Sequence, residues 1–151
     1  MVSPLIVSNN FILRAAEHSQ TITPMKLQKL LYLLYARFLA ETDRSLFSDR
    51  FEKWQYGPVL SEVYTAFKKY GSGTITTFCP DSNGEVLLVD ESHAEFRACF
   101  DDVWDRYGCM TGITLSNITH QENSAWTKVR HMGDFLRDED IRVDGERFFA
   151  G

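Results

Sequence analysis

The sequence predicts a mainly α, α+β fold: a single-domain helical bundle around a central apolar helix, with one small β-hairpin. Apolar residues recur at helical spacing over residues 27–39, and glycines and prolines divide the rest into helix-length segments. Two β-prone runs also flank an Asn-Gly turn. With 151 residues, of which 44% are hydrophobic, the chain has the size of one compact domain, so we expect residues 1–151 to form one.

The segment that follows Thr23 and Pro24 is expected to be the central helix. Thr23 supplies a capping hydroxyl, and Pro24 suits the first helical position. Tyr32, Leu33 and Tyr35 extend the apolar surface around the cylinder, and a helix that is apolar on most sides belongs in the middle of a bundle. The residues of its main apolar face are Leu27, Leu30, Leu31, Leu34, Phe38 and Leu39.

Helices are expected on both sides of this central one. A first helix opens at Pro4 and ends near residues 18–20. Pro58 is expected to start another amphipathic helix, which Gly71 and Gly73 stop.

The second half of the chain is expected to begin with the hairpin. The runs 75–78 and 85–89 are β-prone and flank the turn dipeptide Asn83-Gly84. Helical spacing then returns. The expected helices cover residues 91–107, 115–118, 126–129 and 141–149, with Ser124 and Asp138 as caps of the last two.

Composition excludes several classes of protein. The three cysteines never stand in a CxxC spacing, which argues against a disulfide framework and a zinc site and favours a reducing cytoplasm. No apolar run reaches the roughly 18 residues of a membrane span, and residues 1–13 lack the features of a signal peptide. Glycine-rich phosphate loops are absent. We therefore expect a cytoplasmic protein without cofactor or metal.

The net charge of −5 is unevenly distributed. Residues 1–75 carry a charge of +3, and residues 76–151 carry −8. An acidic protein is repelled by phosphate backbones, which disfavours nucleic acid as a partner. The acidic half could steer a basic protein partner, or it could be a solvated surface that keeps the protein soluble.

The sharpest local feature is the segment Trp54-Gln55-Tyr56-Gly57-Pro58-Val59. Its glycine permits backbone angles closed to other residues, and its proline fixes the entry into the following helix. The aromatic pair suits a binding hot spot, where Trp and Tyr are enriched. The same residues could instead lock the corner between two helices, and the two interpretations are compatible.

A second feature is the run Thr119-His120-Gln121-Glu122, which precedes Trp126. A histidine close to a carboxylate can act as a general base or as a metal ligand. Cys109 with His120 could also imitate a Cys–His pair. No second histidine stands at ligand spacing, however, so a structural histidine beside Trp126 and a role in partner recognition stay open.

Three segments in this order resemble the Panacea domain, the SocA-like antitoxin family, of the phage-associated type. They are LQKLLYLLY from Leu27, SLFSDRFEKWQYGPVLSEVYTAFKKYG, and LSNITHQENSAW, and the resemblance runs from about residue 27 to about residue 149. The chain departs from the pattern at Ala125, where members commonly have proline. The resemblance implies a mostly helical domain, often encoded in prophages or beside a toxin gene, that neutralises a partner toxin by direct contact.

Residue chemistry and the resemblance together give an expected interaction site. The expected partner-binding residues are Trp54, Tyr56, Glu62 and Tyr64 on the turn-helix edge, followed by His120, Glu122 and Trp126. The expected structural residues of the motifs are Leu27, Leu30, Leu31, Gly57, Pro58 and Val59. The expected partner is a cognate toxin encoded next door, and a homo-oligomer is compatible with the sequence. The alternatives are a small enzyme using His120 with Cys109 or Glu122, and a DNA-binding regulator.

Overall fold

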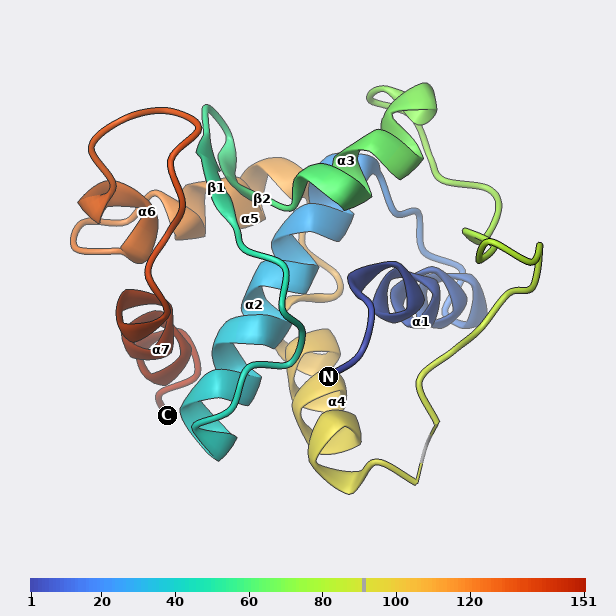
Figure 1. The fold of residues 1–151 in the computed structure, drawn as a ribbon, viewed down its shortest axis with the longest axis horizontal. Helices are drawn as coiled ribbons and strands as arrows, with labels where there is room; N and C mark the ends of the chain where they lie inside the picture. The colour runs from blue at the N-terminus through green and yellow to red at the C-terminus, as the bar shows by residue number, and fades with distance from the viewer. Residues whose placement is uncertain (91) are drawn as a thin grey trace.

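A computed structural model describes residues 1–90 and 92–151 and shows a helical protein with one small sheet (Figure 1). Its helices are α1 (Pro4–Glu17), α2 (Pro24–Thr42), α3 (Ser61–Phe67), the 3₁₀ helix η1 (Lys68–Tyr70), α4 (Ala94–Tyr107), α5 (Gly112–Thr119), α6 (Ala125–Lys128) and α7 (Asp138–Arg147). Strands β1 (Glu52–Trp54) and β2 (Gly57–Val59) pair antiparallel. The predicted mainly α fold with a small hairpin is thereby confirmed.

Helix α2 is the centre of the bundle, as its apolar pattern predicts. It packs against α1, α3, α4, α5, α7 and β2, and Figure 1 shows it running through the middle of the molecule. Leu27, Leu30 and Leu31 are completely buried. The predicted start is also confirmed, because the hydroxyl of Thr23 accepts a hydrogen bond from the backbone N–H of Lys26 at 3.2 Å. No helix within residues 1–90 and 92–151 is both long and apolar enough to cross a membrane.

Helix α7 lies unusually close to α2. A Cβ added to Gly145 would stand only 2.0 Å from the carbonyl oxygen of Ala36, so only glycine allows this approach. Beside it, the buried carboxylate of Asp144 accepts a 2.6 Å bond from the hydroxyl of Tyr32 and a 3.1 Å bond from the backbone N–H of Ala125. Burial raises the pKa of both Tyr32 and Asp144. One polar group thus joins α2, α6 and α7.

The hairpin lies elsewhere than predicted. The runs 75–78 and 85–89 form no strands, and the two strands stand instead on either side of Gln55 and Tyr56. The predicted Asn-Gly turn does form, since the N–H of Gly84 donates to the carbonyl of Asp81 at 3.0 Å and Gly84 has a φ of +80°. The prediction of this turn was right, but that of the paired strands around it was wrong.

Two asparagines of α1 explain why these runs do not pair with each other. The carboxamide of Asn9 bonds both the N–H and the C=O of Cys79, at 2.8 and 2.9 Å. The carboxamide of Asn10 does the same with Val89, at 2.9 and 3.4 Å. Each amide takes the place of a neighbouring strand, so the two arms of the loop are fastened to α1 instead of to one another.

Some predicted helix boundaries also need correction. Pro58 does not start a helix but lies in β2, since its fixed φ suits an extended strand as well, and α3 begins at Ser61. Ser124 caps α6 as predicted, whereas the cap of α7 is Arg137 and Asp138 is the first helical residue. The predicted start of the fourth helix at residue 91 lies outside the described residues, and α4 is described from Ala94.

Candidate functional site

The β1–β2 hairpin forms the tight corner that the aromatic segment predicted. Trp54 pairs with Gly57, so only Gln55 and Tyr56 make the turn. Gly57 has a φ of +121°, a conformation that side-chain-bearing residues rarely adopt. A Cβ at this position would also stand 2.7 Å from Lys29 Cε and 2.7 Å from Thr119 Oγ1. Both the backbone angle and the space therefore require glycine here.

Side chains from the α5–α6 region hold the outer half of this corner. Three consecutive carbonyl oxygens of the turn each accept a hydrogen bond from one of them. The bonds are Trp126 Nε1 to Trp54 O at 2.7 Å, His120 Nε2 to Gln55 O at 2.9 Å, and Ser116 Oγ to Tyr56 O at 2.6 Å. The turn is thus fixed through its backbone, which leaves its own side chains unconstrained by these bonds.

Helix α2 holds the inner half of the corner. Lys29 is buried and donates from Nζ to the carbonyl of Pro58 at 2.9 Å, and burial lowers its pKa from 10.5 to about 7. The buried carboxamide of Gln28 bonds both the N–H and the C=O of Leu60, at 2.9 and 3.0 Å. The buried N–H of Leu60 depends on this contact for its partner, whereas the C=O of Leu60 also accepts from the backbone N–H of Tyr64 at 2.9 Å.

The three sequence segments singled out above therefore meet at one place. The start of α2, the aromatic corner and the stretch from α5 to α6 are linked by side-chain to backbone hydrogen bonds. Sequence reasoning missed Gln28, Lys29 and Ser116 as parts of this arrangement. The available sign was that Gln28 and Lys29 interrupt an otherwise apolar run, since buried polar side chains in such a run need partners.

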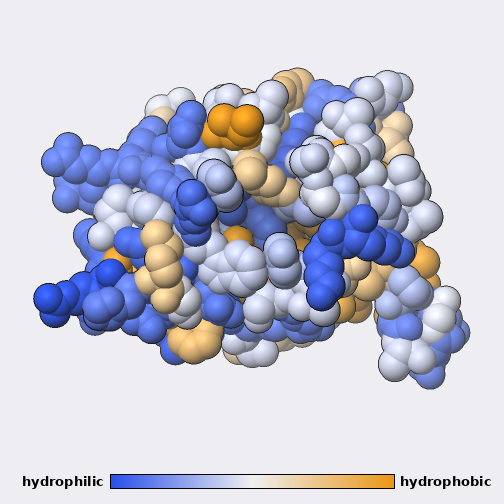
Figure 2. All heavy atoms as spheres, turned by 90° about the horizontal axis from the view of Figure 1, so that it is seen from above, coloured by the Kyte–Doolittle hydropathy of each residue, from blue (hydrophilic) through white to orange (hydrophobic). Residues whose placement is uncertain are grey.

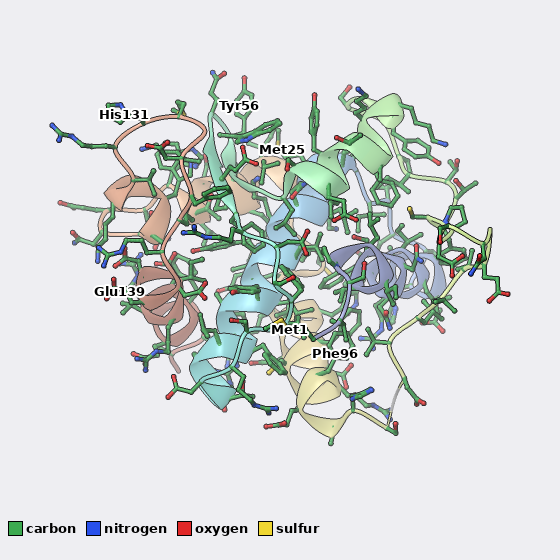
Figure 3. All side chains as sticks on the ribbon, viewed as in Figure 1. Met1, Met25, Tyr56, Phe96, His131 and Glu139 are labelled. Atoms are coloured by element: carbon green, nitrogen blue, oxygen red, sulfur yellow. The ribbon has the colours of Figure 1, made fainter. Side chains whose placement is uncertain are left out.

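Aromatic rings gather on the outer surface of the corner. Tyr56 is 58% exposed and Tyr64 is 44% exposed. Trp54 is half-buried and lies with its ring centroid 4.7 Å from that of Tyr64. Figure 3 shows Tyr56 at the tip of the hairpin, projecting away from the body of the protein, with Met25 below it at the start of α2. The structure thus brings together three of the four residues expected on the turn-helix edge.

An apolar groove of about 350 Å³ lies beside these rings, between the hairpin, the start of α2 and α3. Met25, Val63 and Phe67 contribute to its lining, together with all three aromatic residues. Figure 2 looks onto this end of the molecule, where pale side chains of intermediate hydropathy occupy the middle and strongly hydrophilic ones project at the left margin. A groove of this size and composition can accept one or two apolar side chains.

The fourth residue expected on this edge, Glu62, is exposed on α3 and does not line the groove. A hydrogen bond with the carboxyl group of Asp49 raises the pKa of Glu62, and burial and the neighbouring negative charge act in the same direction. Glu62 is therefore one member of a carboxyl pair beside the aromatic surface.

The second group of expected site residues separates into two kinds. The ring of His120 lies 3.9 Å from that of Trp126, and Lys53 Nζ lies 4.1 Å above the same indole, so Trp126 is half-buried between them. Glu122 is exposed, and its backbone carbonyl accepts a 3.1 Å hydrogen bond from Arg147. His120 and Trp126 thus support the corner from behind, whereas Glu122 lies on the surface.

The catalytic alternative needs His120 to face Cys109 or Glu122, and its ring points elsewhere. One ring nitrogen lies 2.6 Å from the carbonyl of Ser116 and the other 2.9 Å from that of Gln55. Cys109 accepts a 3.0 Å bond from Gln20 instead. Both His120 nitrogens therefore face backbone carbonyl oxygens in this structure. Among the described residues, no three His, Cys, Asp or Glu side chains cluster as metal ligands would.

Comparison with known proteins identifies the family of this chain. The family described as "Antitoxin SocA-like, Panacea domain" matches residues 27–127. The chain is also 40% identical over 124 residues to the protein named Antitoxin SocA from Caulobacter vibrioides (strain NA1000 / CB15N), which covers 80% of this chain. The match spans 66% of that relative's length. No solved structure matches the chain. The chain belongs to the Antitoxin SocA-like, Panacea domain family.

Proposed function

We propose that this protein is an antitoxin that neutralises a partner toxin by binding it directly through the face around the corner. The observation that carries the proposal is the contrast between the rings and the backbone of this corner. Tyr56 and Tyr64 stand exposed beside an apolar groove, while the turn beneath them is fixed by buried and half-buried side chains of the family's motifs. The name of the relative, Antitoxin SocA, supports the role.

A fixed backbone under exposed rings favours protein binding for an energetic reason. Ordering a flexible loop costs free energy on association, and a turn that is already held pays little of it. Tyrosine adds a large contact area with few rotatable bonds, and is enriched among hot-spot residues. A standard interface hides roughly 800 Å² on each partner, which the hairpin, the groove and α3 together can supply.

The charge of the chain favours a basic toxin. The net charge is −5, and residues 76–151 alone carry −8. This net charge acts at long range: it speeds association with a positively charged protein and slows it with nucleic acid, although residues 1–75, which include the hairpin and α3, carry +3.

Co-expression tests this proposal. The product of the gene next to this one, produced alone in a bacterial host, is expected to stop growth, and production of both proteins is expected to restore it. The two proteins should then co-purify. The double variant Tyr56→Ala with Tyr64→Ala should bind at least about tenfold more weakly, because hot-spot truncations commonly cost 2 kcal/mol or more.

Val143→Ala is the matched control, since Val143 is an equally exposed apolar residue, 46% exposed, on α7. It should restore growth like the unmodified protein. A neighbouring toxin that is neutralised without any complex, or equally well by the double tyrosine variant, would refute binding through this face.

A further inference from the structure

Residues 85–89 run along α1 with the backbone bonding of a strand, although no strand is paired with them. In a strand, the N–H and C=O groups of one residue point to one side, and those of the next residue point to the opposite side. Here every second residue bonds inward, towards the turn or towards α1. These inward partners are Asp81 for Glu85, Asn9 for Leu87 and Asn10 for Val89.

The two intervening residues present the opposite edge. Within residues 1–90 and 92–151, no hydrogen bond uses the backbone N–H or C=O of Val86 or Leu88. Their side chains, and that of Leu87, are 47%, 43% and 41% exposed respectively. An exposed edge with unpaired backbone groups and adjacent apolar side chains is a template for another strand, which proteins usually cover or charge.

The segment's own charges indicate what kind of strand fits it, because Arg14 and Arg97, which share a pocket with Val89 and Asp90, lie 2.8 and 3.9 Å from the carboxylate of Asp101. Residues 81–90 contain three acidic residues, Asp81, Glu85 and Asp90, and no basic one. An antiparallel pair of two copies would place these acidic ends near one another, which is unfavourable. A strand from another protein with Lys or Arg at its ends would face them favourably.

We infer that residues 85–89 are a docking edge for an extended segment of another protein, apolar at its centre and basic at its ends. The four free backbone groups of Val86 and Leu88 pair with this segment, as in strand addition to a sheet edge. Asn9 is buried and, with Asn10, holds the edge from behind. The pairing therefore needs no rearrangement of the chain.

This edge is separate from the face proposed to bind the toxin. Figure 1 shows residues 85–89 on the α1 side of the molecule, away from the β1–β2 hairpin. The inference therefore does not depend on the antitoxin role, and its test uses no toxin.

Two synthetic heptapeptides, KTVVVTK and ETVVVTE, test the edge by NMR titration of the full chain. KTVVVTK is expected to shift the amide resonances of Val86 and Leu88 and to slow their hydrogen exchange. ETVVVTE is expected to bind at least about fivefold more weakly, the effect of about one surface ion pair. The inference is wrong if KTVVVTK leaves both amides unchanged, if the two peptides bind equally, or if the shifts appear at the hairpin.

Variants locate the pairing. Leu88→Pro removes an outward N–H and should abolish binding of KTVVVTK. Ser82→Pro is its control, because Ser82 occupies the second position of the turn from Asp81 to Gly84, where proline is favoured. Leu88→Lys keeps the backbone and should weaken binding of KTVVVTK by about fivefold through charge repulsion. Unchanged binding by both Leu88 variants would overturn the inference.

Peptide-free spectra test a second copy as the occupant. The Val86 and Leu88 amides should keep the same shifts at every protein concentration. Shifts that grow with protein concentration would assign the edge to self-association and refute the basic partner.

Discussion

The β1–β2 hairpin and the loop of residues 75–90 are held in the same way but in different surroundings. A carboxamide grips both backbone groups of one residue in each: Gln28 binds Leu60 near the hairpin, and Asn9 binds Cys79 in the loop. The residues from Gly57 to Leu60 are buried, whereas most of the loop is exposed. The same bond therefore closes a core in one region and fastens a surface segment in the other.

The difference in burial between the two regions decides how strongly their hydrogen bonds constrain the backbone. A backbone group inside the protein must find a protein partner, because leaving it unpaired costs about 1–3 kcal/mol. A backbone group at the surface can bind water instead. Buried backbone groups of the corner are accordingly paired with protein groups, while no hydrogen bond among the described residues uses the backbone groups of Val86 and Leu88 in the loop.

The largest difference between the two regions is expected for alanine at their turn glycines. Gly57→Ala should lower the free energy of unfolding by about 4 kcal/mol, because it adds backbone strain and a clash with Lys29 and Thr119. Gly84→Ala should cost only about 1 kcal/mol, since Gly84 has a φ of +80° but no atom within 4 Å of an added Cβ. Urea unfolding of both variants measures the difference. Equal losses would show that the corner is no more constrained than the loop.

The carboxamides of Gln28 and Asn9 should also contribute differently to the free energy of unfolding. Gln28→Ala should cost about 2 kcal/mol, because it leaves the buried N–H of Leu60 unpaired, while the C=O of Leu60 keeps its 2.9 Å bond from the N–H of Tyr64. Asn9→Ala should cost about 1 kcal/mol, since water can reach its partners, half-buried Cys79 and exposed Leu87.

Hydrogen exchange measures independently how well the carboxamides of Gln28 and Asn9 protect the amides that they bind. The amide of Leu60 should lose much of its protection in Gln28→Ala, and that of Cys79 should exchange fast even in the unmodified protein. A strongly protected Cys79 amide would mean that the loop is as well closed as the corner.

Lys29 makes the stability of the corner depend on pH. Its native pKa is about 7, and an unfolded lysine has a pKa of 10.5. Between these values the unfolded chain binds more protons than the native one, so the free energy of unfolding rises with pH. The rise should be about 1.6 kcal/mol between pH 7 and pH 8.5.

Lys29→Met should flatten this rise, whatever it does to stability at a single pH. Urea unfolding at several pH values measures both slopes. An unchanged slope in the variant would assign the pH dependence to groups other than Lys29.

The helices could be predicted because they depend on residues that are close together in the sequence. The spacing from Leu27 to Leu39 gives the central helix, and Thr23 and Ser124 mark helix starts. The position of the hairpin could not be predicted in this way. The β-prone residues of the loop pair with Asn9 and Asn10, which lie about 70 to 80 positions away, and such distant partners leave no local trace.

The candidate site was predictable in its surface residues and not in its support. Trp54, Tyr56 and Tyr64 stand together because a turn and the following helix are neighbours in sequence. That Gln28, Lys29 and Ser116 hold the turn depends on the packing of α2 and α5. These supporting roles become visible only in the structure, where segments far apart in the sequence are in contact.

The smallest effect on stability is expected at Tyr56, where the side chain and the backbone have separate roles. Tyr56→Ala should change the free energy of unfolding by less than about 0.5 kcal/mol, because the side chain is 58% exposed. Ser116→Ala should cost about 1 kcal/mol, because the carbonyl of Tyr56 loses its 2.6 Å hydrogen bond. Urea unfolding compares the two variants. A larger loss for Tyr56→Ala than for Ser116→Ala would mean that the ring, and not the held carbonyl, keeps the corner in place, which would leave the ring less available to a partner.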